Sequence, residues 1–419
     1  MERYSWNRQF AALLAVQLLV STAHGMFTPL LPGFLQESGA VSGGRLPIWS
    51  GLIFSSNFIA MMLAMPLLGR FGDRYGRKPV MLWSGFGMAV VTALMSLAHE
   101  PWLLTALRFV QGCFTGILPF AMVLVLIGAA ERKVGVSAGT MQTMGETGSL
   151  LGPLAGSLLL TLLPAREAFP AMSLCIALAA VCVALFVKEA PLAQPADAAA
   201  KTSFKQDWVV LWRCKPLPSL LLSALCVNFS LVGMQPVLPY YVAESTYRFA
   251  WLSEEWQLGI TLSVTSLAVI LFSPLLGRAA DRIGPLPLLK LSTAAAACLC
   301  AVQAFTHLYP IILACRFLLG LCIAGMMPNI QAQVRRLVQP GMESRTYAAV
   351  NSWMFFGSLA GPLLGGAITA WFGTSGWFAA AGLMFAISFW QALRIAASAR
   401  AAGAASQEAG SAAASAASA

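Results

Sequence analysis

The sequence predicts an all-α integral membrane protein in which twelve transmembrane helices form two pseudo-symmetric bundles of six. Three observations support this fold class: an apolar composition, apolar runs of membrane-spanning length, and an internal repeat. The chain has 419 residues, of which 58% are hydrophobic and 10% charged, and its mean hydropathy is +0.75. Soluble chains are roughly half apolar, so a single soluble core would not hold this much apolar surface.

Apolar runs of about 18 to 25 residues, the length that crosses a bilayer core as a helix, recur along the sequence. The first run is too long for the core of a signal peptide and lacks an A-x-A cleavage site, so we predict that it is a span. The predicted spans are 10–35, 48–69, 79–98, 102–129, 138–163, 170–187, 217–243, 256–277, 286–306, 310–334, 346–371 and 376–397.

The distribution of Lys and Arg sets the predicted orientation. Of the 26 such residues, Arg45, Arg166 and Arg248 fall on one side of the membrane, and Arg108 and Arg316 lie within spans. The others lie in the N-terminus, in loops after even-numbered spans or in the tail. Positive residues stay inside, so both termini are predicted to be cytoplasmic. Because topology accounts for the net charge of +10, no basic patch indicates nucleic-acid binding.

An internal repeat relates the two halves of the chain. PLLGRFGDRYGRKPV, which starts at Pro66, returns as PLLGRAADRIGPLPL at Pro274, with nine of fifteen letters identical at an offset of 208. Arg108 returns at the same offset as Arg316. An even number of spans gives both halves the same orientation, and parallel halves of this kind indicate a transporter with its site between them near the midplane.

The repeat divides the chain into predicted parts. The six-helix bundles are residues 1–187 and 217–397, joined by a linker at 188–216 whose second part is amphipathic and predicts a helix on the cytoplasmic membrane surface. A plain tether is the alternative for that stretch. The Ala-, Ser- and Gly-rich tail at 398–419 is predicted to be disordered. The nine Cys form no C-x-x-C pair, so neither a disulfide framework nor a structural zinc site is indicated.

The loop GRFGDRYGRKPV between spans 2 and 3 resembles the signature loop of the major facilitator superfamily, and the layout of two halves is similar to that family along almost the whole chain. The resemblance implies the major facilitator fold and a cytoplasmic gate in which Asp73 meets the positive end of a helix in the other half. Alternatively, the charges only orient the loop. Pro285 and Leu286 replace two cations in the second copy and predict a weaker latch there. The predicted gate-loop residues are Gly69, Asp73, Arg74, Gly76, Arg77, Lys78, Asp281 and Arg282.

Span 5 has a series of small residues that resembles the motif of the family's antiporters, which implies export. The motif residues are Gly139, Gly148, Gly152, Pro153 and Gly156, with Ser157 in place of a final glycine. The glycines that recur every four residues predict a smooth stripe against which a helix of the other half packs, and the proline predicts a kink. Generic small-residue packing is the alternative.

Proton coupling is predicted at Glu146, the only acidic residue within a predicted span. Its predicted partner is Arg108, which with Gln111 and Gly112 resembles the family's intramembrane arginine motif. A low dielectric favours the neutral carboxyl and a nearby guanidinium favours the charged one, so movement of the arginine would let Glu146 bind and release a proton. His24, at a depth similar to Arg108, is predicted as a further proton relay. A static ion pair and a hydrogen-bonding wall histidine are the alternatives.

The resemblance implies a substrate cavity built mainly from spans 1, 4, 7 and 10. Two buried arginines against one glutamate make its interior mildly positive, which favours neutral, zwitterionic or anionic cargo over permanently cationic drugs. The predicted cavity residues are Gln17, Phe27, Gln111, Phe114, Gln142, Asn228, Gln235 and Arg316.

These features predict a monomeric secondary transporter in a bacterial inner membrane that exports a small organic molecule by proton antiport with alternating access. Its energy source is the proton gradient, without a cofactor or metal. The cargo is either drug-like or a secreted metabolite such as a siderophore, and a proton-coupled uptake symporter is a second alternative. The sequence has neither a G-x-x-x-x-G-K-[ST] stretch nor H-E-x-x-H, so an enzyme is not predicted.

Overall fold

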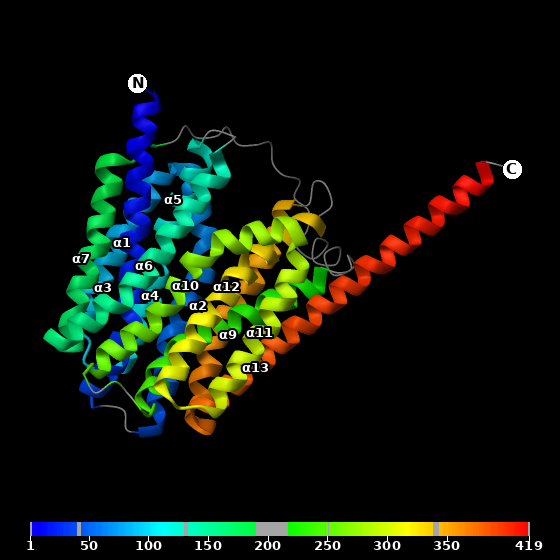
Figure 1. The fold of residues 1–419 in the computed structure, drawn as a ribbon. Helices are drawn as coiled ribbons and strands as arrows, with labels where there is room; N and C mark the ends of the chain where they lie inside the picture. The colour runs from blue at the N-terminus through cyan, green and yellow to red at the C-terminus, as the bar shows by residue number, and fades with distance from the viewer. Residues whose placement is uncertain are drawn as a thin grey trace.

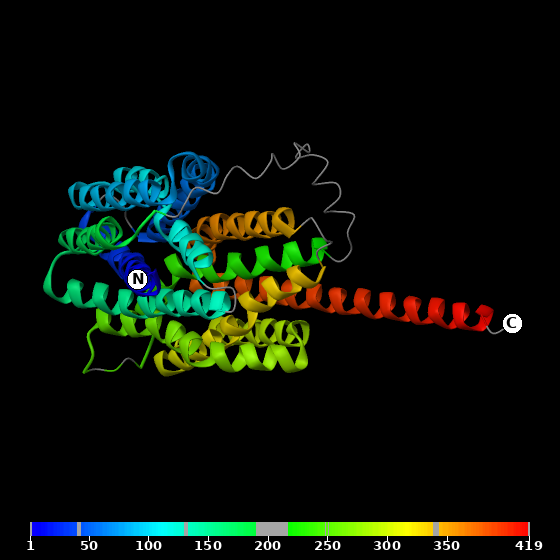
Figure 2. The ribbon, with the colours of Figure 1, turned by 90° about the horizontal axis from the view of Figure 1, so that it is seen from above.

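The computed structural model describes residues 2–39, 43–129, 133–189, 217–247, 249, 251–337 and 343–417. Within these residues the chain forms long helices, and the only β-type pairing is one isolated bridge between Thr246 and Leu308. Figure 1 shows two bundles side by side, the first half of the chain in blue to green and the second in green to orange. The view from above in Figure 2 separates the same two groups of helices.

Each half contributes helices long enough to cross a membrane. The first half contains α1 (Glu2–Glu37), α2 (Leu46–Tyr75), α3 (Arg77–Leu94), α4 (Pro101–Gly112), α5 (Ile117–Gly128), α6 (Val134–Leu162) and α7 (Ala165–Phe186). The second half contains α9 (Leu217–Ala243), α10 (Glu254–Ile283), α11 (Pro285–Phe305), α12 (Tyr309–Leu337) and α13 (Glu343–Ala417). Short 3-10 turns at Gly43–Arg45 and Met95–Leu97 precede α2 and follow α3.

Each predicted span coincides with helical structure to within a few residues, and span 4 consists of two helices, α4 and α5, that a turn at 113–116 separates and that together count as one candidate span. Among the described residues, ten helices are long and apolar enough to span a membrane. The helix α6 is not one of them because Gly, Thr, Gln and Glu dilute its apolar content. Spans 11 and 12 lie in the single element α13, where Gly373 interrupts the helical backbone with a φ of 74°.

The C-terminal tail differs from its prediction. We expected disorder from residue 398 onward, but α13 continues as a helix to Ala417 and projects away from the bundle (Figure 1). Alanine has the highest intrinsic helix propensity, so an alanine-rich segment becomes helical without a core to pack against. The amphipathic part of the linker, Lys201 and Arg248 lie outside the described residues.

The repeat is reproduced in the turns between helices. Gly76 joins α2 to α3 with a φ of 96°, and Gly284 joins α10 to α11 with a φ of 90°. Both positions lie in a backbone region that glycine enters without steric cost, so a single residue reverses the chain at each. The two glycines are 208 positions apart, as the sequence repeat requires.

The glycine stripe of α6 packs within its own half, which corrects the prediction that it meets the other half. A Cβ atom on Gly152 would lie 2.5 Å from the Thr22 carbonyl oxygen, and one on Gly156 would lie 2.8 Å from the Met26 carbonyl oxygen, both in α1. Gly357 of α13 approaches α9 in the same way. The four-residue spacing predicts close helix packing but carries no information on which helix is the partner.

The two halves meet along two seams that the repeat relates to each other. The Ser55 hydroxyl of α2 donates to the Leu359 carbonyl of α13 at 2.9 Å. The Ser263 hydroxyl of α10 donates to the Leu150 carbonyl of α6 at 2.6 Å. These contacts lie in the parts of α2 and α10 remote from the glycine turns that end both helices.

Candidate functional site

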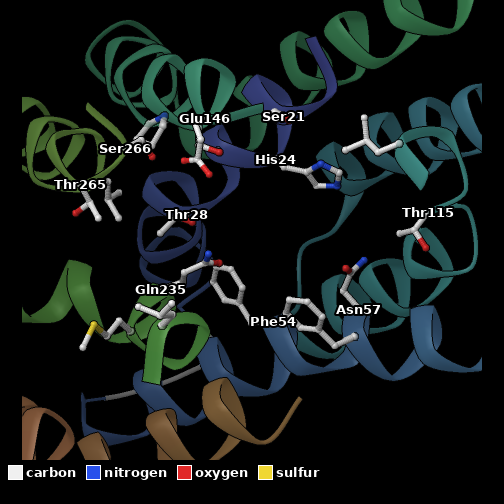
Figure 3. A pocket seen from close by; sticks show the side chains of 18 of the residues that line it. Ser21, His24, Thr28, Phe54, Asn57, Thr115, Glu146, Gln235, Thr265 and Ser266 are labelled. Atoms are coloured by element: carbon white, nitrogen blue, oxygen red, sulfur yellow. The ribbon is translucent and has the colours of Figure 1, made fainter. Parts of the chain in front are cut away.

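A cavity of about 550 Å³ lies between the two halves. Its walls come from α1, α4, α5, α9 and α12, which correspond to the four predicted spans, and also from α2, α3, α6 and α10. Figure 3 shows polar side chains from both halves around this space. The ionisable residues that line it are His24, Arg108, Glu146 and Arg316.

Glu146 of α6 lines the cavity. Ser149 lies on the same face and lines the cavity as well. The Glu146 carboxylate accepts a hydrogen bond from the Gln142 side-chain amide, one turn earlier, at 3.4 Å. Gln142 itself is exposed and is not among the lining residues. Figure 3 shows Glu146 and His24 pointing into the same space, from α6 and α1.

Arg108 is buried, with only 5% of its surface exposed, and its guanidinium lies 3.7 Å from the centroid of the Phe27 ring. Its Nη1 donates to the Gln111 side-chain oxygen at 2.6 Å, and Gln111 in turn donates to the Thr92 hydroxyl at 2.6 Å. The predicted ion pair with Glu146 is therefore absent in this conformation. An ion pair does form between Arg166 and Glu37, at 3.9 Å.

Arg316 occupies the equivalent place in the second half. It is 7% exposed, and its Nη1 lies 3.3 Å from the Met234 sulfur. The backbone around the two arginines is also equivalent. The Asn57 amide donates to the Arg108 carbonyl at 3.2 Å, and the Thr265 hydroxyl donates to the Arg316 carbonyl at 3.3 Å.

Gln142 and five other predicted cavity residues do not line the cavity. Phe27 and Gln111 are each 1% exposed and pack around Arg108 behind the cavity wall. Phe114 packs on Trp83 of α3, with ring centroids 5.5 Å apart. The Asn228 amide donates to its own helix at Ala224, and Gln17 donates to Ser21. Residue type and depth in the membrane do not fix helix rotation, which decides the face on which a side chain lies. Gln235 and Arg316 do line the cavity.

Several lining residues were missed from the sequence. They include Thr28, Phe54, Asn57, Thr115, Thr265 and Ser266. The sequence does contain a signal for one pair of these lining residues. Asn57 and Thr265 are polar residues within apolar spans, and the repeat offset of 208 separates them. Phe54 and Thr28 carry no such signal because apolar and hydroxyl residues are common throughout the spans.

The gate loop contacts its own half in this conformation. Glu189, which follows α7, accepts hydrogen bonds from the backbone amides of Arg77 and Lys78 at 2.8 Å each. The Lys78 ammonium donates to the Ala184 carbonyl at 2.9 Å. Asp73 is exposed, and its carboxylate makes no ion pair or hydrogen bond with any residue that the structure describes. Sequence inspection missed Glu189 because it lies 112 positions from Arg77.

The loop of the second half, with Asp281 and Arg282, is likewise exposed. In the described part of the chain, no group of three or more His, Cys, Asp or Glu residues is arranged to hold a metal ion.

Comparison with known proteins identifies the family. The sequence profile of the Major Facilitator Superfamily matches residues 13–255 and 249–417. The multidrug resistance protein MdtG of Salmonella paratyphi A is 30% identical over 396 residues, which cover 93% of this chain and 96% of that protein. The MdtG protein of Citrobacter koseri is similar to the same extent.

Solved structures show the same fold. The human organic anion transporter MFSD10 (TETRAN) has a TM-score of 0.68 at 20% identity, covering 92% of this chain and 99% of that one. The nucleoside transporter NupG has a TM-score of 0.73 at 15% identity, covering 93% and 98%. The profile match over nearly the whole chain, the MdtG relatives and these structures agree, and this chain belongs to the Major Facilitator Superfamily.

Proposed function

We propose that this protein exports a small organic molecule from the cytoplasm in exchange for protons. Membership of the superfamily makes it a secondary transporter, a multi-pass protein of the inner membrane, rather than an enzyme. The observation that carries the proposal is a cavity between the halves whose described wall has a single carboxylate, Glu146. The multidrug resistance relatives support a drug-like cargo and the outward direction.

The contacts between the halves support an inward-facing conformation. The two seams at Ser55 and Ser263 lie in the parts of α2 and α10 remote from the Gly76 and Gly284 turns. The positive-inside rule places those turns in the cytoplasm, so the seams lie toward the outside. The Asp73 carboxylate, which has no hydrogen-bond or ion-pair partner among the described residues, fits this state, because a cytoplasmic latch engages only when the cytoplasmic side closes.

Glu146 is the proposed proton carrier. It lies at the cavity wall, where cargo and proton have access to the same carboxylate, and ionisable groups within membranes are functional by default. Cargo that contacts the ionised carboxylate from the cytoplasm excludes the proton. After the cavity reopens to the outside, release of the cargo leaves the carboxylate ready to take a proton inward.

In the inward-facing state the Arg108 guanidinium packs on Phe27 and donates a hydrogen bond to Gln111, so it does not contact Glu146. Its positive charge then acts on the proton affinity of Glu146 only through the electric field in the cavity. His24 shares the cavity with Glu146 and is the second candidate for proton transfer. The gate loop around Asp73 closes the cytoplasmic side in the alternate state, when the positive end of a helix in the other half comes within reach.

A transport assay in everted membrane vesicles tests direction and coupling together. Vesicles energised to be acidic inside are loaded with a pH-sensitive dye and challenged with a panel of antibiotics and culture-medium extracts. The proposal predicts that a cargo accumulates inside these vesicles while protons leave, relative to vesicles without the protein. Accumulation in right-side-out vesicles together with protons identifies an uptake symporter instead and overturns the proposal.

A further inference from the structure

We propose that Arg108 and Arg316 together form a site for an anionic group of the cargo. This inference rests on the proposed function, because it names the chemical class that the central cavity recognises. Both arginines line the cavity, one from each half, and both are the eighth residue of their helices, α4 and α12. The repeat therefore brings two guanidiniums to the same space at equivalent depth.

The two guanidiniums keep buried hydrogen-bond donors without partners. The Nε atoms of Arg108 and Arg316 are buried, and neither has a hydrogen-bond partner. The Arg316 guanidinium donates to the Met234 thioether, which is a weak acceptor. Neither arginine forms an ion pair with any acidic residue that the structure describes. Buried polar groups are normally satisfied. Because both side chains line the cavity, their unpartnered Nε donors point to an acceptor that arrives from outside and that the guanidiniums turn to meet.

A structural role explains these arginines less well than a ligand does. The Phe27 ring covers one face of the Arg108 guanidinium, and Gln111 takes one of its five N–H donors. The edge bearing Nε stays unsatisfied. A guanidinium edge presents two parallel donors that match the oxygens of a carboxylate, sulfonate or phosphate. Two such guanidiniums, on arginines that are each more than nine-tenths buried and that line one cavity, favour an anionic group over a neutral one.

Proton antiport adds a second requirement to the cargo. A proton on Glu146 removes the internal negative charge of the cavity, so a purely anionic cargo would bind together with the proton rather than in exchange for it. Exchange requires the cargo also to present a cationic or hydrogen-bond-donating group to the Glu146 carboxylate. The expected class is therefore an amphoteric organic molecule whose acidic group lies at Arg108 and Arg316.

A matched pair of fluorescent probes tests the anion site without any gradient. The anion 8-anilinonaphthalene-1-sulfonate and neutral N-phenyl-1-naphthylamine share one skeleton and differ by the sulfonate. Saturable binding of each is measured with the full chain in lipid nanodiscs, against empty nanodiscs. The variants are Arg108→Gln, Arg316→Gln and Arg316→Lys. The control is Arg394→Gln, which removes a guanidinium that packs on the Trp390 ring in α13.

The proposal predicts that Arg316→Gln weakens sulfonate binding about tenfold or more and changes binding of the neutral probe by less than about twofold. Arg316→Lys restores part of the loss, and Arg394→Gln changes neither affinity. If Arg108→Gln does not fold, the Arg316 variants decide the question. Equal changes for both probes, an unchanged sulfonate affinity, or no saturable sulfonate binding to the wild type overturns the anion site. The proposed export is judged separately, because it fails or succeeds in the vesicle assay.

Discussion

At the scale of single residues, Glu189 shows how one side chain connects two elements of the gate. The first amides of a helix lack partners within it, and a carboxylate at that end satisfies them and interacts favourably with the helix dipole. Glu189 accepts from two such amides of α3, immediately after the Gly76 turn. The end of α7 is thereby tied to the loop that carries Asp73.

Replacing this cap should loosen the start of α3. We expect Glu189→Ala to lower the local protection of the Arg77 and Lys78 amides by about 0.5–2 kcal/mol, as for other lost N-caps. Hydrogen exchange of the purified protein measures this directly. Glu100→Ala is the matched control, because Glu100 precedes α4 without a side-chain cap bond. Equal loss of protection at both helix starts would argue against a specific cap.

At the scale of elements, α6 presents three different surfaces. Gly148, Gly152 and Gly156 pack against α1, whereas Pro153 and Ser157 lie against Gly259 of α10 in the other half. The third surface, with Glu146, faces the cavity. One helix therefore contacts its own half, the other half and the proposed cargo, so movement between the halves changes the surroundings of Glu146.

The glycines of α6 should differ sharply in their tolerance of a methyl group. A Cβ atom at Gly148 would lie 2.5 Å from the Ser21 Cβ and 2.8 Å from the Leu18 carbonyl oxygen. We expect Gly148→Ala to destabilise the protein by about 1–3 kcal/mol through overpacking. At Gly139 no atom lies within 4 Å of the added carbon, so Gly139→Ala should leave stability unchanged or raise it by about 0.5–1 kcal/mol. Thermal unfolding of the two variants checks the ranking, and an equal loss would contradict it.

The two gate loops should also differ. We expect Asp73→Asn to reduce the transport rate severalfold while cargo binding stays intact, because the proposed role of the carboxylate is to close the gate and it does not line the cavity. Asp281→Asn should have a smaller effect, since Pro285 and Leu286 stand where the first loop has Arg77 and Lys78. Initial rates in vesicles, compared with probe affinities, separate the two effects. A normal rate for Asp73→Asn would show that the charges only orient the loop.

Rotation of helices is the part of the site that the sequence does not determine. The depth of a residue along a span follows from the positions at which the span begins and ends. The faces of Phe27, Gln111 and Asn228 depend on which helix packs behind them, and each is buried away from the cavity. The sequence predicts Arg108 as the partner of Glu146 because both are ionisable residues within spans, whereas in the structure Phe27 and Gln111 hold the Arg108 side chain.

At the scale of the whole molecule, the internal repeat explains most of what the sequence predicts correctly. An offset of 208 relates the glycine turns, the buried arginines and the seam serines Ser55 and Ser263. The fold, the two halves and the location of the cavity between them follow from that symmetry. Glu189 and Glu146 have no acidic counterpart in the second half. Within the described residues, only the first half therefore has the Glu189 contact to its loop and a carboxylate at the cavity wall.

The orientation of the molecule is testable by labelling. In a cysteine-free background, we expect Arg45→Cys to react with an impermeant thiol reagent from outside and Arg77→Cys only from inside. The positive-inside rule gives this order, because Arg45 precedes α2 and Arg77 begins α3. Reactivity in intact cells compared with everted vesicles measures it, and the reverse pattern would place both termini outside.

The most direct test of proton coupling is proton release from the purified protein when it binds a cargo that the vesicle assay identifies. A pH indicator in weakly buffered detergent solution reports the release for the wild type and for Glu146→Gln. The proposal predicts release from the wild type and none from the variant, although the variant still binds the cargo. Normal release from Glu146→Gln, together with accumulation of cargo against a gradient, would contradict the central role of Glu146 and direct attention to His24.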